Sequence, residues 1–323
     1  MKKTVTVFLA SYNKKATIKN CIDSLLDLDY PFDKILILDG GSKDGTYEIL
    51  REYQQKYPNK IDLRQMLIGH SDRINWALDN IKTEYVALTD ADCVVEKDWL
   101  DRLLAGFDGE ENIIATAGYC GTPKDVSLLQ RLIGLEIGER FKRLPHYLYR
   151  APTMNLCLKT DIARKVRFDE KQKVAIETDF GFRLTKQGKM LYRPTAKVWH
   201  HHRGSLGGYF NQQKEYAKWG LRLIFKHKSQ ALSDPITSLG MTIQIPLFAG
   251  GLFFLILSVL NKLFLYPSAI LLLPLLAIYI NNIVAIRPPF KYYLPLFGLL
   301  IFRTIAWTYG LFLGIISFSK IID

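Results

Sequence analysis

Charged residues are scarce in the last quarter of this chain. After residue 235 there are five Lys or Arg residues and a single acid, Asp323, whereas the first 235 residues carry +8 of the total formal charge of +12. Arg303 is the only charged residue within three long apolar stretches, at residues 236–260, 263–286 and 293–318. About 20 apolar residues are enough to cross a bilayer as a helix. This excludes a purely soluble protein, and we expect an all-α transmembrane region of about three helices at residues 234–323.

Cysteine is also rare, and no Cys-x-x-Cys pair occurs among Cys21, Cys93, Cys120 and Cys157. This spacing argues against a zinc site or a disulfide framework, so we expect free buried thiols in a reducing compartment. The first four residues lack the apolar core of a secretory signal, and no signal peptide is expected.

The front part of the chain alternates two kinds of pattern. Strand-like apolar runs at residues 4–10, 34–38, 61–67 and 85–90 are separated by segments with apolar residues at helical spacing. This alternation predicts an α/β domain with a mostly parallel, doubly wound sheet. Ligands of such sheets bind outside the carboxyl ends of the strands.

Two of these predicted strands end in acidic motifs. Asp90 and Asp92 follow one strand, and carboxylates at this spacing suit a hard divalent cation such as Mg²⁺ or Mn²⁺. The alternative is an acidic helix start, because Glu96 and Asp98 follow. Asp39 ends another strand and opens a glycine-rich loop, where it could accept hydrogen bonds from a ribose or a base. The alternative there is a plain glycine turn.

Taken in order, these motifs resemble the inverting glycosyltransferases of family 2, which have the GT-A (Rossmann-like) fold. The similarity covers about residues 4–220. It is carried by Ser11-Tyr12-Asn13, the loop from Asp39 to Thr46, Asp90-Ala91-Asp92, Phe168-Asp169-Glu170 and the segment from Glu177 to Leu184. The resemblance implies a catalytic domain at residues 1–205 that uses a nucleotide-diphosphate sugar and Mg²⁺ or Mn²⁺.

The resemblance also implies roles for single residues. Tyr12 and the backbone around Ser11 would line the nucleobase, Asp39 would bind the base or ribose, Asp90 would lie near the ribose and the metal, and Asp92 would bind the metal.

The catalytic base is left open between Glu177 and Asp179, because Ile176 stands where the family usually has a Glu. Like-charge repulsion by Asp179 could raise the pKa of Glu177. A base that faces the metal across the sugar predicts inversion at the anomeric carbon. The alternative is that both acids simply start a helix.

Three adjacent histidines follow Trp199. In an extended segment His200 and His202 share one face and His201 points away. We expect His200 to bind the metal or the diphosphate, with Arg203 assisting at the phosphates. A pair of surface histidines without a role is the alternative.

Two further helices have an amphipathic pattern. The helix expected in residues 127–149 is predicted to pack on the sheet rather than to form a lid near the membrane. Residues 206–233 carry a basic stripe, formed by Lys214, Lys218, Arg222 and Lys226. Such helices lie on anionic membrane surfaces, so we expect contact with membrane lipids and no nucleic acid partner.

Arg303 has two interpretations: a contact to the phosphate of a lipid-linked substrate, or a side chain that snorkels to the interface. Three spans would place the Arg287–Lys291 loop in the cytosol and Lys262 outside, in weak agreement with the positive-inside rule. The predicted protein is an integral membrane protein whose catalytic domain is cytosolic.

The predicted activity is sugar transfer from a nucleotide-diphosphate sugar to a hydroxyl of a lipid-linked or membrane glycan. One alternative is a polyprenyl-phosphate glycosyltransferase, whose anionic acceptor needs no base. Gly69-His70-Ser71-Asp72 lacks the basic, glycine-rich character that this alternative usually has. The other alternative is an inactive membrane scaffold of the same fold, which the retained acidic motifs argue against.

Overall fold

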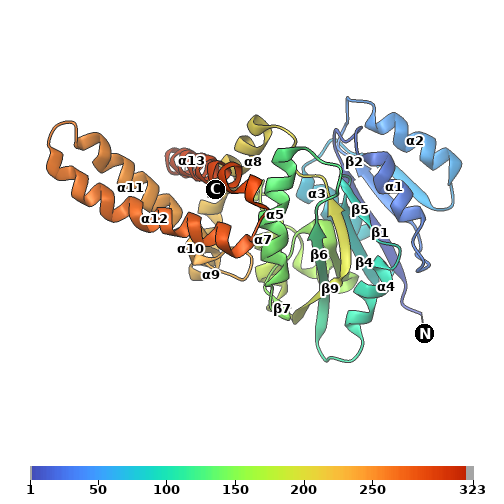
Figure 1. Cartoon of the computed structure of the whole chain (residues 1–323). Helices are drawn as coiled ribbons and strands as arrows, with labels where there is room; N and C mark the ends of the chain where they lie inside the picture. The colour runs from blue at the N-terminus through green and yellow to red at the C-terminus, as the bar shows by residue number, and fades with distance from the viewer. Residues whose placement is uncertain (1, 318–323) are drawn as a thin grey trace. The chain divides into compact units, whose positions relative to one another are not determined.

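The structure, a computed structural model, describes residues 2–317, which form two compact units. The first unit contains the residues up to 126 and residues 141–202, and the second contains residues 127–140 and those from 203 onward. Figure 1 shows the sheet of the first unit and the long helices of the second.

The first unit is built on a mixed sheet with nine strands within the described residues, in the order β3-β2-β1-β4-β8-β6-β9-β5, with β7 paired to β9. The pairs among β1 to β4 are parallel, whereas β8 runs antiparallel to both of its neighbours. The predicted α/β class is therefore confirmed. The strands are β1 Val5–Ser11, β2 Ile35–Asp39, β3 Ile61–Gln65, β4 Tyr85–Asp90, β5 Cys93–Val95, β6 Ile113–Gly121, β7 Tyr147–Leu148, β8 Leu156–Lys159 and β9 Lys189–His200.

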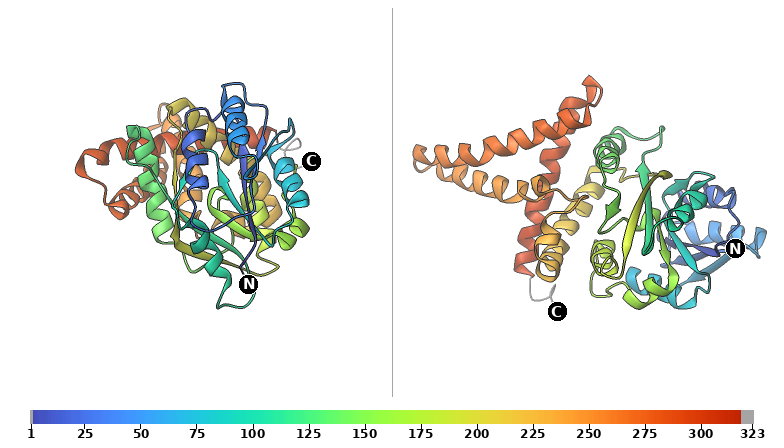
Figure 2. Two further views of the ribbon diagram at one scale, coloured as in Figure 1. Left: turned by 90° about the vertical axis from the view of Figure 1, so that its right-hand side faces the viewer. Right: turned by 90° about the horizontal axis from the view of Figure 1, so that it is seen from below.

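Helices cover both faces of this sheet (Figure 2). They form because apolar residues recur at helical spacing: the four such residues of α1, Ile18, Cys21, Ile22 and Leu25, are all buried. Burying each of the Ile and Leu side chains contributes roughly 1.5–3 kcal/mol. The helices of the first unit are α1 Ile18–Leu26, α2 Thr46–Lys56, α3 His70–Asn80, α4 Trp99–Leu104, α6 Thr160–Val166 and α7 Ile176–Leu184, with short 3-10 turns η1 Ala105–Phe107 and η2 Thr153–Asn155.

The strand register gathers polar residues at one edge of the sheet. Ser11 lies opposite Asp39, and Asp39 lies opposite Gln65. On the other side of β1, Ala10 lies opposite Asp90. Because these strands are parallel, their carboxyl ends meet at the same edge, as the sequence pattern predicted.

The second unit is helical, and three of its described segments are long and apolar enough to span a membrane: Leu239–Leu257, Lys262–Ile286 and Phe290–Ile316. The three predicted apolar helices are confirmed, although the first begins after residue 236 and residue 318 lies outside the described residues. The elements are α5 Leu128–Lys142, α8 Leu206–His227, α9 Ser229–Leu232, α10 Leu239–Thr242, α11 Gln244–Leu257, η3 Lys262–Phe264, α12 Leu265–Ile286, η4 Phe290–Tyr292 and α13 Tyr293–Ile316.

Helix α5 corrects one expectation. Its residues up to 140 belong to the second unit, where Leu132 and Ile133 are buried in a cluster with Tyr209, Leu275 and Leu296. The prediction that this helix packs on the sheet is therefore wrong for most of its length. The physical reason is that its apolar face finds apolar side chains of α8, α12 and α13. Its last two residues belong to the sheet unit, where the Phe141 carbonyl accepts a hydrogen bond from Tyr192 Oη at 2.8 Å.

The surroundings of Arg303 correct a second expectation. Its side chain is 2% exposed and forms an ion pair with Glu136 of α5. The guanidinium therefore neither snorkels nor faces lipid, and both interpretations offered from the sequence are wrong. The basic stripe of α8 is not uniformly exposed either, because Arg222 is buried.

Candidate active site

Asp39 organises the loop that follows β2. Its Oδ1 accepts hydrogen bonds from the backbone N–H of Gly41 at 2.9 Å and of Ser42 at 2.8 Å, and its Oδ2 accepts one from Ser42 Oγ at 2.6 Å. Gln65 adds a fourth, at 3.3 Å. Asp39 is 0% exposed, so its carboxylate holds the loop from within. A contact between Asp39 and the base or ribose of a nucleotide stays a prediction.

The turn from Asp90 to Asp92 is held by its backbone. The Ala91 carbonyl accepts a hydrogen bond from Thr17 Oγ1 at 2.9 Å, and the Asp92 carbonyl accepts one from the His201 N–H at 2.9 Å. These bonds tie the turn to α1 and to the end of β9. The two carboxylates are thus fixed at the edge of the sheet where Ser11 also lies. The alternative of an acidic helix start is excluded, because β5 begins directly after Asp92.

The two carboxylates differ in their electrostatic surroundings. Burial by itself would raise the pKa of Asp92, but His200 and the Lys14 ammonium that pairs with its Oδ2 bring that pKa well below its usual value. Burial and the Asp92 charge raise the pKa of Asp90 to about 6, and the charge of Glu177 contributes in the same direction. The site therefore holds one firmly ionised carboxylate beside one that is easily protonated.

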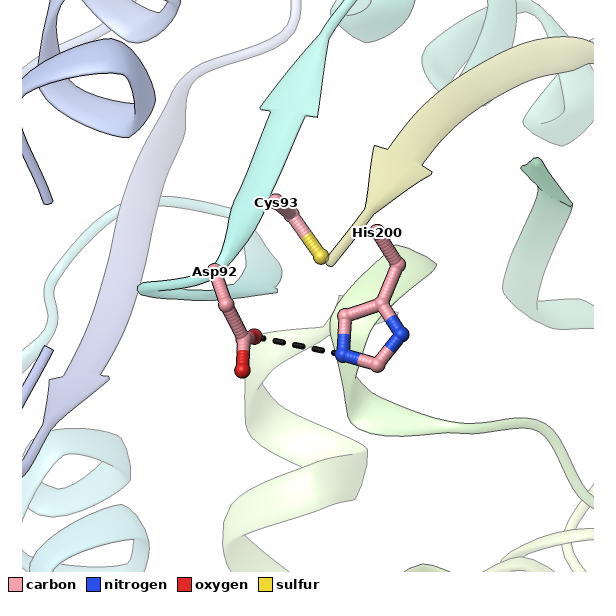
Figure 3. A group of neighbouring side chains, drawn as sticks. All are labelled: Asp92, Cys93 and His200. Atoms are coloured by element: carbon pink, nitrogen blue, oxygen red, sulfur yellow. Dashed lines mark ion pairs between the residues drawn. The ribbon is translucent and has the colours of Figure 1, made fainter. Parts of the chain in front are cut away.

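Figure 3 shows the His200 ring, at the end of β9, turned toward the Asp92 carboxylate. His200 Nε2 lies 3.3 Å from Asp92 Oδ1, and with Cys93 Sγ these groups offer ligand atoms within 4.8 Å of one another. Burial raises the pKa of the Cys93 thiol far above its usual value, so this sulfur is protonated and a poor ligand. The remaining carboxylate and imidazole fit a cation such as Mn²⁺. Asp90 is not in this group, and its metal contact stays a prediction.

His200 belongs to a hydrogen-bonded row. Its Nδ1 lies 3.1 Å from His202 Nδ1, and His202 Nε2 lies 2.9 Å from Thr122 Oγ1. The expectation that His200 and His202 share a face is therefore confirmed. His201 instead lines a hollow of about 450 Å³ together with Trp199 and Thr122.

The structure separates the two candidates for the base. Asp179 is 0% exposed, and its Oδ2 accepts hydrogen bonds from Arg183 Nε at 2.9 Å and Nη2 at 2.7 Å. Glu177 is half-buried, and burial raises the pKa of its carboxyl, although Arg150 acts in the opposite direction. The expected cause of this shift was wrong, because burial and not Asp179 produces it. Asp179 is engaged in a structural ion pair, whereas Glu177 influences Asp90.

Three further predicted site residues differ in their exposure. Ser11 is buried at the edge of the sheet, Tyr12 is 53% exposed, and Arg203 is exposed at the start of the second unit. The roles of these three stay predictions.

The sequence motifs did not identify Lys14 or Thr122 as site residues, and they assigned no role to His202. The i, i+4 spacing of Asp179 and Arg183 was a readable signal of their helical ion pair. Thr122 and Lys14 had no such local signal.

Residues 6–164 match the family described as Glycosyl transferase family 2. This segment, just under half of the chain, belongs to that family. The match includes Asp39, Asp90 and Asp92 of the family-2 domain but ends before Glu177 and His200, so the roles of these two rest on the geometry.

Among curated relatives, the chain is 23% identical over 229 residues to the poly-beta-1,6-N-acetyl-D-glucosamine synthase of Staphylococcus epidermidis. It is also 23% identical over 232 residues to the synthase of the same name of Staphylococcus aureus (strain COL). In both cases the match covers 69% of this chain and 56% of the relative. The chain thus spans little more than half the length of these relatives.

Solved structures support the same fold. The mannosyltransferase PcManGT from Pyrobaculum calidifontis, in complex with GDP-Man and Mn²⁺, has a TM-score of 0.62 at 17% identity, over 96% of this chain and 88% of that one. Residues 1–349 of TarS from S. aureus give a TM-score of 0.53 at 17% identity, over 98% and 91%. At these identities the likeness concerns the fold alone.

Proposed function

We propose that this chain is a membrane-bound inverting glycosyltransferase that moves a sugar from a nucleotide-diphosphate sugar to an acceptor hydroxyl. The observation that carries this proposal is the pair of Asp92 and His200 beside Asp90 at one edge of the sheet. Glu177 is close enough for its charge to raise the pKa of Asp90. Family membership of the domain supports the reaction class.

Asp92 and His200 would hold the cation. A carboxylate with an imidazole suits Mn²⁺ better than Mg²⁺, because Mg²⁺ prefers oxygen ligands alone. When bound, the cation neutralises charge that develops on the departing diphosphate. Lys14 now occupies Asp92 Oδ2, so its ammonium would turn from this oxygen and could pair with a phosphate.

Glu177 would act as the general base. A base is most effective when its pKa lies near the working pH, and burial moves the pKa of Glu177 upward from 4.5. Asp179 is committed to Arg183 and would have a structural role. A base on the acceptor side supports a neutral hydroxyl as nucleophile and direct displacement with inversion, rather than an already ionised polyprenyl phosphate.

The acceptor would be a lipid-linked or membrane glycan. Three apolar helices follow the catalytic part of the chain, and the curated relatives are named as synthases of a polymer of N-acetylglucosamine. Nucleotide sugars are made in the cytosol, which favours a cytosolic catalytic domain.

The test uses membranes from cells that express the full chain. They are incubated with labelled UDP-GlcNAc, UDP-glucose or GDP-mannose, and lipid products are extracted before and after mild acid. We expect transfer from one donor, its loss in Asp92→Asn, and its loss in EDTA with recovery on Mn²⁺. Full activity of Asp92→Asn or in EDTA would refute the metal role. The proposed transfer to an acceptor hydroxyl would be overturned if no donor of a broad panel gave a product. It would also be overturned if the only acceptor were a polyprenyl phosphate.

A further inference from the structure

Three polar groups behind the Asp92 carboxylate form one continuous row, whose outer member lines the hollow beside Trp199. Thr122 Oγ1 lies 2.9 Å from His202 Nε2, His202 Nδ1 lies 3.1 Å from His200 Nδ1, and His200 Nε2 lies 3.3 Å from Asp92 Oδ1. The two rings meet edge to face at 86° with centroids 4.7 Å apart, and His202 is buried. Each ring nitrogen of the two histidines therefore has a partner in the row.

We infer that His202 and Thr122 are positioning residues, which orient the His200 ring and provide the hydrogen-bond acceptors for the tautomer of His200 that can bind a divalent cation. This inference rests on the proposed function, because it assumes that a cation binds at Asp92 and His200. It adds two residues for which neither the motifs nor the family match supplied a role.

The positions of the ring protons decide which nitrogen of His200 can bind a cation. A ring nitrogen that binds a cation must present its lone pair, and a neutral imidazole carries one proton. With the cation on Nε2, the proton of His200 is therefore on Nδ1 and is donated to His202 Nδ1. His202 must then carry its own proton on Nε2, from where it is donated to Thr122 Oγ1. Every contact of the row is satisfied in this arrangement.

Without a cation, His200 Nε2 has to donate a hydrogen bond to Asp92. A neutral His200 then accepts at Nδ1 from His202, and His202 accepts at Nε2 from the Thr122 hydroxyl. The hydrogen bonds of the neutral row can thus all point in either of two opposite directions. Only one direction leaves the lone pair of His200 Nε2 available for a cation. A threonine hydroxyl permits both because it can donate or accept.

A partner behind a metal-binding histidine sets the orientation and the basicity of the ring, and its loss typically weakens metal affinity by roughly 10–100-fold. Thr122→Val keeps the shape of the side chain but removes the hydroxyl, so the Nε2–H of His202 loses its acceptor in the cation-binding arrangement. Thr122→Ser keeps the hydroxyl. His202→Phe keeps a ring but removes both nitrogens. His201→Phe is the matched control, because His201 is adjacent in sequence and lies outside the row.

The experiment titrates the full chain in detergent with Mn²⁺ alone and measures free Mn²⁺ by electron paramagnetic resonance. We expect Thr122→Val and His202→Phe to bind Mn²⁺ roughly 10–100-fold more weakly, and Thr122→Ser and His201→Phe to stay within about twofold of the unmodified chain. Thermal unfolding without Mn²⁺ is recorded for each variant. The half-buried position of Thr122 keeps the Val/Ser comparison decisive even if His202→Phe fails to fold.

Three results would overturn the inference while leaving the proposed function intact. Thr122→Val could bind Mn²⁺ as tightly as the unmodified chain, or Thr122→Ser could bind it as weakly as Thr122→Val. The third is that Thr122→Val loses unfolding temperature in parallel with its Mn²⁺ affinity. If the unmodified chain takes up no Mn²⁺, or if Asp92→Asn binds as tightly, then the metal site of the proposed function is wrong and this inference falls with it.

Discussion

Arg303 of α13 and Glu136 of α5 form an ion pair inside the second unit, although 167 residues separate them in the sequence. Gln244 Oε1 accepts further hydrogen bonds from Arg303 Nη2 at 3.4 Å and from Thr304 Oγ1 at 3.2 Å. The Arg303 guanidinium also lies 4.3 Å from the centroid of the Trp307 ring. A charge between apolar helices is tolerated here because it is paired and hydrogen-bonded.

This pair gives the first prediction. Removing one member of a buried ion pair leaves an uncompensated charge and costs about 3–5 kcal/mol, whereas replacing both members by apolar residues is often close to neutral. We expect Arg303→Met and Glu136→Met each to lower the thermal unfolding midpoint strongly, and the double variant to regain most of the loss. Arg102→Met is the control, because its pair with Asp98 is exposed and is worth at most about 1 kcal/mol. Additive losses in the double variant would contradict the prediction.

Much of this architecture could be predicted from the sequence because the signals are local. Buried parallel strands give continuous apolar runs, and amphipathic helices give a periodic pattern, so β1 to β4 and α1 to α3 follow from their own residues. The facing of His200 and His202 is equally local, since it follows from strand periodicity. The polar partners of the site could not be obtained in this way. Lys14 meets Asp92 across 78 residues, and His202 meets Thr122 across 80, through packing that no short pattern encodes.

Glu177 and Asp179 give the second prediction. If Glu177 is the base, Glu177→Gln should retain donor binding but lose turnover by roughly 10²–10⁴-fold, the usual contribution of general base catalysis. Asp179→Asn should act differently, because it weakens the buried ion pair with Arg183. We expect it to lower the unfolding temperature, while the molecules that remain folded keep most of their turnover. Single-turnover kinetics and donor titration separate these effects. If Asp179→Asn removed turnover from a fully folded protein, the roles would be reversed.

The raised pKa of Glu177 gives the third prediction, on stability against pH. Between its ordinary pKa of 4.5 and the higher pKa of the folded state, the folded chain binds more protons than the unfolded chain, so Glu177 lowers stability as the pH rises through this window. Glu177→Gln should therefore unfold at a higher temperature than the unmodified chain near pH 7. The difference should shrink toward pH 4, where Glu177 is protonated in both states.

Thermal unfolding of both proteins across this range measures the effect, with Asp179→Asn as a control of opposite sign. A Gln variant that is less stable at neutral pH would contradict the assigned direction. The acid limb of the turnover–pH profile should likewise lie above pH 4.5, because only ionised Glu177 can accept the proton of the acceptor hydroxyl.

Two glycines of α13 give the fourth prediction. A Cβ at Gly310 would collide with the Lys214 carbonyl of α8, whereas a Cβ at Gly298 would meet nothing within 4 Å. Small residues of this kind let helix backbones approach closely in membranes. We expect Gly310→Ala to cost about 1–3 kcal/mol of stability through overpacking. Gly298→Ala on the same helix should be neutral or stabilising by up to about 1 kcal/mol, because alanine favours the helix. Equal effects of the two changes would argue against a close α8–α13 contact.

The proposed orientation gives the last prediction. With the catalytic domain in the cytosol and three spans, Lys262 would lie on the outer side of the membrane and Lys291 in the cytosol. Both side chains are exposed, and the four native cysteines are free and buried, so a single introduced cysteine can be labelled selectively. We expect a membrane-impermeant maleimide to label Lys262→Cys in intact cells and Lys291→Cys only after the membrane is disrupted. The reverse pattern would place the catalytic domain outside, away from cytosolic nucleotide sugars. Labelling of both in intact cells would show that the central helix does not cross the bilayer.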